Sequence, residues 1–352
     1  MSMAKPSHAL ASILLLACGF FTAAQTPPTQ STSSLLVNVL DRKGNAVRNL
    51  TKDNFRVKVN GHPAAVVAAD YGLAPRRIVV LLDMSGSMAG RAEQNNKWQV
   101  AREAIEDLIT ETPADVQVAL ITFSTQVHDV FDFSQNRASI AAWLKQGSSQ
   151  RSDINGATAF YDALVAATKL LQPARPGDAI YAITDGGDNH SHVSRTETRK
   201  LLLQSGIRLF LFLFAEPTPL ELQSEAGPVG VLELAHETGG FVFGVAGERG
   251  LDLFDFNYDA GEKTQDRIKR YTQALNVQVN GFYTLHLETP IRPSKLGKVS
   301  LEIVDSTGKA SKEVAWTYQR FFSPPDLRRL TVVTEPPLRN RPSPPAPASP
   351  AR

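Results

Sequence analysis

Carboxylate and hydroxyl side chains recur in this sequence at places where short apolar runs end. One carboxylate and two hydroxyls lie within five residues, at Asp83, Ser85 and Ser87, directly after an apolar run. A further hydroxyl, that of Thr158, precedes a helical pattern, and Asp185 follows a later apolar run. Serines after a strand often only make turns or helix caps. Open α/β sheets, however, bind ligands at the carboxyl edge of their strands, so these segments together indicate one ligand-binding spot.

Five continuous apolar runs between residues 77 and 247 supply the strands that would position these side chains. The runs are Ile78–Leu82, Val116–Phe123, Ile180–Ile183, Leu209–Phe214 and Phe241–Phe243. Strands that are apolar on both faces belong to a parallel sheet covered by helices on each side. The shorter segment 127–133, of mixed polarity, fits an antiparallel edge strand. We therefore expect an α/β fold, a doubly wound Rossmann-like domain with a mainly parallel sheet.

Two stretches between these runs carry apolar side chains at helical spacing. The first helical face comprises Trp98, Ala101, Ile105, Leu108 and Ile109, and the second comprises Phe160, Leu164, Thr168 and Leu171. Pro113 and Pro173 follow these stretches and end the two helices. The second helix begins directly after Thr158, so this hydroxyl is expected at a helix start.

Segments of alternating polarity flank the α/β region. Residues 35–70 contain the alternating run 55–59, and residues 278–322 contain a second set of alternating runs. A few strands without a partner cannot bury a core. We therefore expect the two segments to pair into one discontinuous β-sandwich-like module, with the α/β domain of residues 77–247 inserted between them. Residues 248–277 would form a helical connector.

The order of the five oxygen-bearing residues resembles the von Willebrand factor type A family. Members of that family carry an Asp-x-Ser-x-Ser loop, a separate Thr and a separate Asp, which together form a metal-ion-dependent adhesion site. All five positions are filled here, within about residues 77–247. The resemblance implies that Ser85, Ser87 and Thr158 bind the metal directly. It implies for Asp83 and Asp185 a role through bound water and in holding the hydroxyls in place.

Two further stretches, 47–55 and 184–189, look like parts of a narrower group. They are similar to exported bacterial proteins, frequent in acidobacteria, that are known as von Willebrand A-related. The biological role of that group is undefined. This second likeness therefore supports the architecture more than it supports a function.

Mg²⁺ is the cation that the resemblance implies, with Mn²⁺ or Ca²⁺ as alternatives. Mg²⁺ takes six oxygens in octahedral array and keeps several waters when few carboxylates reach it. Neutral hydroxyl ligands leave its charge largely uncancelled, so an Asp or Glu of a partner protein can complete the shell. His190 and His192 would suit a softer metal and are not expected to be ligands. Asp188 either supports the site or caps the following helix.

The amino-terminal 24 residues have the pattern of a secretory signal peptide, because Lys5 precedes an apolar run that ends in small residues. The run is shorter than the roughly 20 residues that cross a bilayer, and no later stretch could span one. Cys18, the single cysteine, ends a Leu-Leu-Ala-Cys box similar to that of lipoproteins, so a lipid anchor is the alternative to simple cleavage. We expect an exported protein that is periplasmic, bound to the cell surface or secreted.

The composition narrows the function. The chain has 37 basic and 35 acidic side chains and a formal charge of +2, so it lacks the field that holds a nucleic acid. The sequence contains no Gly-x-Ser-x-Gly elbow, His-Glu-x-x-His helix or phosphate-binding loop, and we do not expect an enzyme. The leading hypothesis is a metal-dependent protein-binding module of the adhesion type. A structural cell-envelope assembly protein with an incidental metal site, or a metal-assisted hydrolase, are the alternatives.

Two segments of low complexity complete the organisation. Residues 25–34 are rich in Thr, Ser, Pro and Gln and are expected to be a linker. Residues 323–352 end in a proline-rich run and are expected to be a disordered tail. Neither segment has enough apolar content to offset the entropy lost on ordering.

Overall fold

A computed structural model describes residues 32–72, 76–89, 91–92, 95–146, 154–214, 228–243, 263–288 and 297–322. The expected signal peptide with Cys18 and the expected tail lie outside these residues. Of the expected linker, only its last residues are described, and they already belong to strand β1 (Thr32–Asp41). In the part of the chain that the structure describes, no helix is both long and apolar enough to span a membrane.

The α/β region contains a six-stranded sheet in the order β11-β10-β9-β4-β7-β8. Its strands are β4 (Arg77–Asp83), β7 (Gln117–Phe123), β8 (Val127–Phe131), β9 (Ala179–Thr184), β10 (Arg208–Leu213) and β11 (Val242–Phe243). Every neighbouring pair is parallel except β7 and β8. Every residue of β4, β9 and β10 is buried, which explains why these strands are apolar on both faces.

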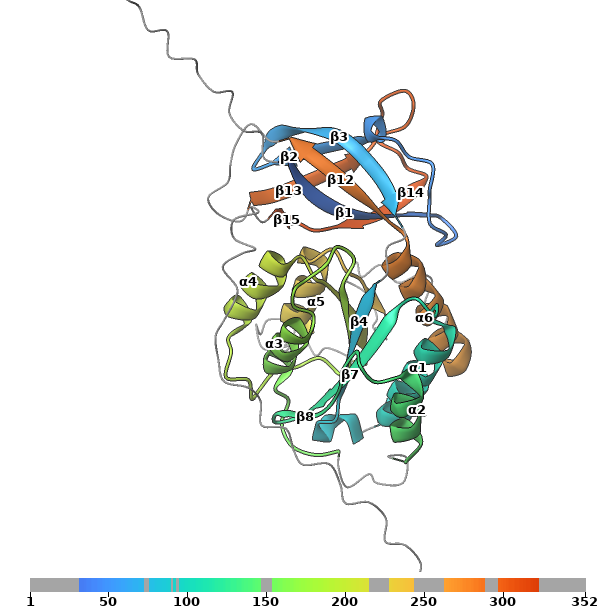
Figure 1. The fold of residues 1–352 in the computed structure, drawn as a ribbon, viewed down its shortest axis with the longest axis vertical. Helices are drawn as coiled ribbons and strands as arrows, with labels where there is room; N and C mark the ends of the chain where they lie inside the picture. The colour runs from blue at the N-terminus through green and yellow to red at the C-terminus, as the bar shows by residue number, and fades with distance from the viewer. Residues whose placement is uncertain are drawn as a thin grey trace, which may run out of the picture. The chain divides into compact units, whose positions relative to one another are not determined.

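Helices cover both faces of this sheet (Figure 1). One face packs against α1 (Lys97–Glu111), α2 (Arg137–Gln146) and α6 (Thr264–Asn280), and the other against α3 (Phe160–Leu170), α4 (Arg195–Ser205) and α5 (Pro228–Glu237). Trp98 and Ile105 of α1 are buried in the first core, and Phe160 and Leu164 of α3 in the second. The doubly wound α/β fold is confirmed.

Helix α6 does more than connect two regions. Its described residues Ile268, Tyr271, Leu275 and Val279 are buried in the same core as the α1 face. These positions are spaced by three or four residues, which places them on one side of the helix. The described part of the expected helical connector, residues 248–277, is therefore largely helix α6, and this helix is part of the α/β core.

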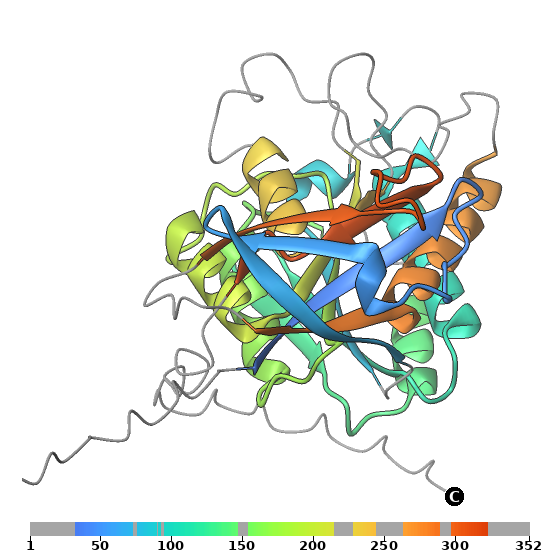
Figure 2. The same ribbon diagram turned by 90° about the horizontal axis from the view of Figure 1, so that it is seen from above.

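The flanking segments form one antiparallel sheet in the order β14-β1-β12-β3-β2-β13-β15. The added strands are β2 (Phe55–Val59), β3 (His62–Gly72), β12 (Phe282–Glu288), β13 (Gly297–Ile303), β14 (Val314–Tyr318) and β15 (Phe321–Phe322). Figure 2 shows the blue amino-terminal strands interleaved with the orange and red carboxyl-terminal strands. Leu35 pairs with Leu285 and Val57 with Leu301, which confirms that a second β module is formed by both flanks.

This module is a single curled sheet, whereas a sandwich would have two separate sheets. The apolar side chains of β1, β2, β12 and β13 share one buried cluster. Leu301 N in β13 donates a hydrogen bond to the hydroxyl of Tyr318 in β14, over 3.3 Å, although these strands are far apart in the sheet order. The strong twist of this antiparallel sheet therefore curls it around its own apolar core. In a sandwich, two separate sheets would enclose such a core.

Buried polar groups link the β module to the amino ends of the parallel strands. Arg208, at the start of β10, is 1% exposed and donates hydrogen bonds of 2.9 Å to the side-chain oxygen of Asn38 and to the carbonyl oxygen of Gln278. Asn38, in β1, donates in turn to the carbonyl oxygens of Gln278 and Gly281, both over 2.7 Å. Burial lowers the pKa of Arg208 to about 9.

Candidate metal site

Strands β4 and β9 bring two of the predicted segments to the same edge of the sheet. They pair in parallel, with Leu82 opposite Ile183, so both carboxyl ends point the same way. Asp83 ends β4 and Asp185 directly follows β9. The short 3-10 helix η2 (Gly86–Ala89) follows β4 and carries Ser87.

Asp83 is the buried anchor of the site. Its Oδ2 accepts a hydrogen bond from the Thr184 hydroxyl over 2.6 Å, and its Oδ1 accepts one from the Ser85 backbone N–H over 2.8 Å. Burial raises the pKa of Asp83 to about 6, and the charge of Asp185 adds to this, while the hydrogen bonds from Thr184 and Ser85 oppose it. The protonated and ionised forms of this carboxyl group therefore coexist at mildly acidic pH.

The two serines extend the site from Asp83 toward solvent. Ser85 is buried and Ser87 is exposed, and their Oγ atoms are 3.1 Å apart. The Ser87 hydroxyl donates to Oδ1 of Asp185 over 3.0 Å. The structure thus brings Asp83, Ser85, Ser87 and Asp185 together through a continuous set of polar contacts.

The third segment, which carries Thr158, is tied to the serine loop through the backbone. Gly86 N–H donates to the Gly156 carbonyl oxygen and Asn155 N–H to the Met84 carbonyl oxygen, each over 3.0 Å. Gly156 has φ of +85°, and a Cβ there would lie 2.9 Å from Thr125. Only glycine therefore fits this close approach without strain.

Thr158 itself is 6% exposed. Its backbone is held by the segment that follows Asp185. Its backbone N–H donates to Oδ1 of Asn189 over 2.8 Å. Its carbonyl oxygen accepts from the N–H groups of Asn189 and His190 over 3.0 and 3.1 Å. The Thr158 segment is thus hydrogen-bonded to both of the other loops, and the three segments meet at one edge of the sheet.

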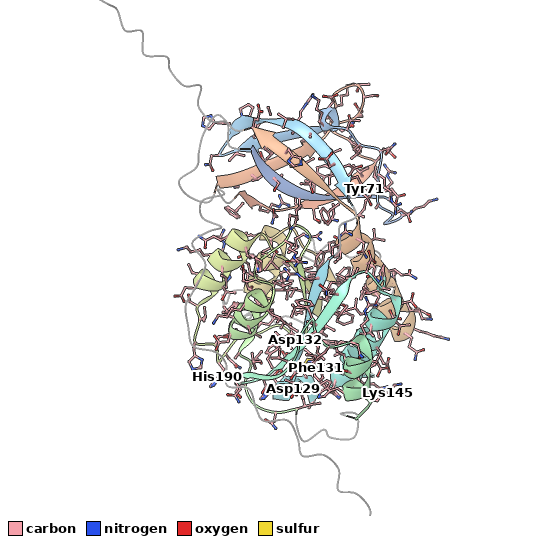
Figure 3. All side chains as sticks on the ribbon, viewed as in Figure 1. Tyr71, Asp129, Phe131, Asp132, Lys145 and His190 are labelled. Carbon is pink, nitrogen blue, oxygen red and sulfur yellow. The ribbon has the colours of Figure 1, made fainter. Side chains whose placement is uncertain are left out.

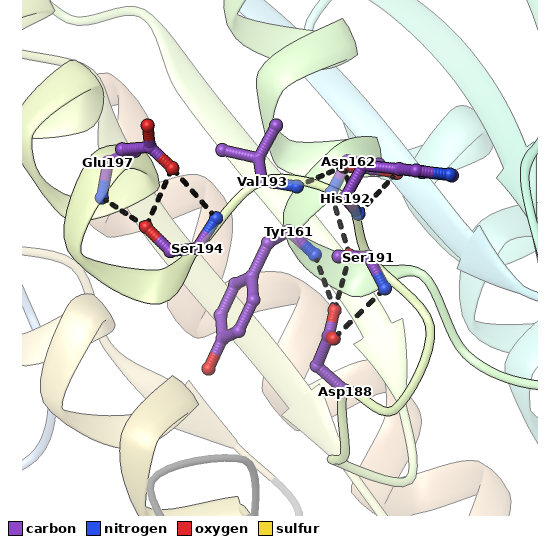
Figure 4. Close-up of polar contacts among 8 residues, drawn as sticks. All are labelled: Tyr161, Asp162, Asp188, Ser191, His192, Val193, Ser194 and Glu197. Atoms are coloured by element: carbon purple, nitrogen blue, oxygen red, sulfur yellow. Dashed lines mark hydrogen bonds and ion pairs between the residues drawn. The ribbon is translucent and has the colours of Figure 1, made fainter.

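Asp188 belongs to a network at the start of α3 (Figure 4). Its Oδ2 accepts from the Tyr161 N–H over 2.9 Å and from the Ser191 hydroxyl over 2.5 Å. The following helix, α4, is capped instead by Ser194, which forms a capping box with Glu197. The sequence left open whether Asp188 supports the site or caps the following helix. The structure shows that Asp188 caps a helix, but this helix is the preceding one, α3, which begins after Thr158.

Lys97 is a polar neighbour that sequence reasoning missed. It is the first residue of α1, and its Nζ lies 2.7 Å from Oδ2 of Asp185. Thr184 and Asn189 were missed as well, although each lies next to a predicted segment. No spacing rule connects Lys97 with Asp185, because the contact depends on where the start of α1 lies relative to the carboxyl end of β9.

The two histidines near the site are not gathered into a metal cluster. His192 Nδ1 lies 2.9 Å from Oδ2 of Asp162, and its side chain is 84% exposed. Figure 3 shows His190 and Asp129 at the same end of the α/β region. Among the described residues, no three His, Cys, Asp or Glu side chains form a group that could hold a metal. A cation at this edge would therefore depend on hydroxyl oxygens.

Several solved structures are similar to this chain at low sequence identity. An aerotolerance-related membrane protein from Bacteroides fragilis is 21% identical, with 58% of this chain and 98% of that chain covered and a TM-score of 0.42. The conserved hypothetical protein BatB from Bacteroides thetaiotaomicron is 20% identical, with coverages of 57% and 98% and a TM-score of 0.40. A von Willebrand factor type A protein from Catenulispora acidiphila is 14% identical, with coverages of 82% and 75% and a TM-score of 0.41.

The sequence comparison is more specific. No curated protein matches the chain. The family model of the von Willebrand factor type A domain matches residues 78–187. That range begins at the second residue of β4 and contains all five predicted site residues, from Asp83 to Asp185. Residues 78–187 of this chain therefore form a von Willebrand factor type A domain.

Proposed function

We propose that this protein is a cation-dependent binding module that takes an acidic side chain of a partner protein. The observation that carries the proposal is the spacing of the two serine hydroxyls. Neighbouring ligands of Mg²⁺ at 2.0–2.1 Å lie about 2.9 Å apart in an octahedron. The 3.1 Å between the Oγ atoms of Ser85 and Ser87 fits two neighbouring ligand positions.

The protonation pattern also fits a cation. The Ser87 hydroxyl donates its proton to Asp185, so a lone pair of its oxygen is left for a metal. Ser85, Ser87 and Thr158 would be the direct ligands, while Asp83 and Asp185 would hold the loops and bind metal-bound water. Mg²⁺ suits this oxygen set best, with Mn²⁺ next and the larger Ca²⁺ last.

The charge of the site supports binding of an acidic partner. Hydroxyl ligands are neutral, so a bound divalent cation keeps much of its charge and attracts a carboxylate. Hydrolysis is less well supported, because it requires a general base beside the reacting water. Both oxygens of Asp83 and of Asp185 already accept hydrogen bonds or pair with Lys97.

The location of the protein is part of the same proposal. A von Willebrand factor type A domain is a protein-interaction module, and the apolar amino-terminal segment suggests that this one is exported. We propose that it acts in the periplasm, at the cell surface or outside the cell. Immunoblotting of cell fractions for the processed chain tests this, and a full-length cytoplasmic form would contradict it.

Calorimetric titration of the purified protein with Mg²⁺ and Mn²⁺ tests the function. The wild type should bind one cation, and the double variant Ser85→Ala/Ser87→Ala should lose it. The control is Ser300→Ala, because Ser300 is an exposed serine on β13 in the β module. Equal binding by the double variant and the wild type would remove the site.

Capture of a partner separates the remaining alternatives. Pull-down of envelope proteins should recover a partner that is lost when EDTA is added and that is also lost with the serine double variant. A partner retained in EDTA would favour a structural assembly role through the β module. It would leave cation binding at the serines without a function in recognition.

A further inference from the structure

A positive side chain lies inside the candidate site. The Nζ of Lys97 is 2.7 Å from Oδ2 of Asp185, and the two side chains are only 18% and 11% exposed. Lys97 is held there by its helix, because Trp98 and Ala101 of α1 are buried in the core beneath it. The start of the helix is therefore fixed beside Asp185, and the low exposure of the ion pair distinguishes it from an exposed pair at the surface.

Lys97 changes the charge that a cation would meet. The Ser87 hydroxyl occupies one oxygen of Asp185 and the Lys97 ammonium the other. Asp83 and Asp185 alone would carry a formal charge of −2. With Lys97 included, the three groups sum to −1, so half of the negative charge is already compensated without a metal.

A second buried ion pair lies at the amino ends of the parallel strands, and its geometry holds both partners in place. Arg77 contacts both carboxylate oxygens of Asp178 and also donates to the carbonyl oxygens of Leu171 and Pro173. A guanidinium fork fixes such an arrangement in several directions. The Lys97 ammonium is a point charge on a flexible stem, which can turn aside while its helix stays in place.

We infer that Lys97 is an internal competitor of the divalent cation, which sets how much cation the site needs before it fills. This inference rests on the proposed cation-dependent function. Repulsion between the ammonium and a divalent cation a few ångströms away weakens cation binding by on the order of tenfold or more. The same ammonium, turned aside, adds a second positive group for the carboxylate of the partner.

A purely structural ion pair would behave differently. If Lys97 only held the Asp185 loop to α1, its removal would loosen Asp185 and weaken cation binding. If Lys97 competes with the cation, its removal strengthens binding. The two roles therefore predict opposite signs for the same measurement.

Titration calorimetry with Mg²⁺ on the purified protein tests the inference. Lys97→Met keeps the stem and removes the charge, so its Kd should fall about tenfold. Lys97→Arg keeps the charge and holds it with a guanidinium fork, so its Kd should be equal to or higher than that of the wild type. Lys298→Met removes an exposed lysine from β13 and should also leave the Kd unchanged. Lys97→Gln is expected to act as Lys97→Met does, and it replaces that variant if it fails to fold.

Thermal unfolding gives a second readout. In EDTA, Lys97→Met should unfold at a lower temperature than the wild type, because two carboxylates lose their counter-charge. Added Mg²⁺ should raise its Tm by more than it raises that of the wild type. An unchanged response to Mg²⁺ would show that the lysine does not compete.

The outcomes separate the inference from the function on which it rests. Tighter binding by Lys97→Met supports both, including the case in which the wild type binds too weakly to measure. Equal or weaker binding by Lys97→Met, with clear binding by the wild type, overturns the role of Lys97 and leaves the proposed function standing. Absence of binding in both proteins overturns the proposed function and the inference with it.

Discussion

The six-stranded sheet has an amino edge and a carboxyl edge, formed by the amino and carboxyl ends of its parallel strands. The buried charges at these two edges have different surroundings. At the amino edge, Arg208 is surrounded by the Asn38 side chain and by backbone carbonyl oxygens. At the carboxyl edge, Asp83 and Asp185 are surrounded by hydroxyls, N–H groups and one ammonium. The amino edge is linked to the β module, whereas the carboxyl edge includes the exposed Ser87.

This difference separates a structural role of charge at the amino edge from the binding role that we propose for the carboxyl edge. A guanidinium bonded to several carbonyl oxygens is costly to remove and has no room for a ligand. Carboxylates beside hydroxyl groups can exchange a proton or an ammonium for a metal. Since strand β10 has only six residues, the two edges are about 20 Å apart, and a change at one edge should leave the other intact.

The largest effect is expected from Arg208→Met at the amino edge. The variant leaves the side-chain oxygen of Asn38 buried without its donor and removes one of the two donors to the carbonyl oxygen of Gln278, so the free energy of unfolding should fall by about 3–5 kcal/mol. Urea unfolding measures the loss. Arg56→Met is the control, because the side chain of Arg56 is 57% exposed and its loss should matter little.

The same variant tests whether the edges are independent. Folded Arg208→Met should bind Mg²⁺ with the affinity of the wild type. A large loss of affinity in protein that remains folded would show that the amino edge controls the site, and the comparison between the edges would be wrong.

Asp83 should make the metal-free protein sensitive to pH. Its pKa rises from 3.8 to about 6 on folding, so the folded state binds the proton more tightly. The stabilisation is fully present below about pH 4 and is lost as pH rises through 6, by about 2–3 kcal/mol. Asp83→Asn should remove this dependence and raise the stability in EDTA at pH 7.

Urea unfolding in EDTA between pH 4 and 7 measures this effect, as the difference between wild type and variant. Asp129→Asn is the matched control, because Asp129 is an exposed aspartate in β8. A difference between wild type and Asp83→Asn that stays constant with pH would contradict the role of burial at Asp83.

A smaller effect is expected from Asn189→Ala at the carboxyl edge. Asn189 accepts the Thr158 N–H through its side chain, so its loss should lower the free energy of unfolding by about 1 kcal/mol. It should also weaken Mg²⁺ binding several-fold, because the Thr158 segment is then held less firmly. Stability and affinity for Mg²⁺ are measured on the same sample. An unchanged affinity would contradict the role of Thr158 as a ligand of the metal.

Ser194→Ala should have the smallest effect and serves as the counterpart of Asn189→Ala. Ser194 caps α4 through the N–H of Glu197, and losing a cap costs about 1 kcal/mol or less. The helix lies outside the polar contacts of the site, so Mg²⁺ affinity should not change. Equal losses of affinity in both variants would mean that affinity follows general stability alone.

Much of the fold and of the site could be predicted where the signal is local in sequence. The runs that became β4, β9 and β10 are apolar on both faces because both faces are covered. Asp83, Ser85 and Ser87 lie within one loop, so their spacing alone brings them together. Thr158 and Asp185 could be added because each is next to the end of a regular element.

The rest depends on long-range geometry that spacing does not encode. Lys97 contacts Asp185 only because the start of α1 lies beside the carboxyl end of β9. Asp188 caps the helix that precedes it in sequence, and no sequence motif predicts this contact. The contact between Leu301 and Tyr318 reflects how far the β sheet curls, which depends on the twist summed over several strands.

The most direct test of the cation site is a crystal of the protein soaked in Mn²⁺. We expect one anomalous difference peak at the carboxyl edge, within about 2.0–2.3 Å of the Oγ atoms of both Ser85 and Ser87. A peak at His190 or His192 instead, or no peak near the serines at saturating Mn²⁺, would contradict the proposed function.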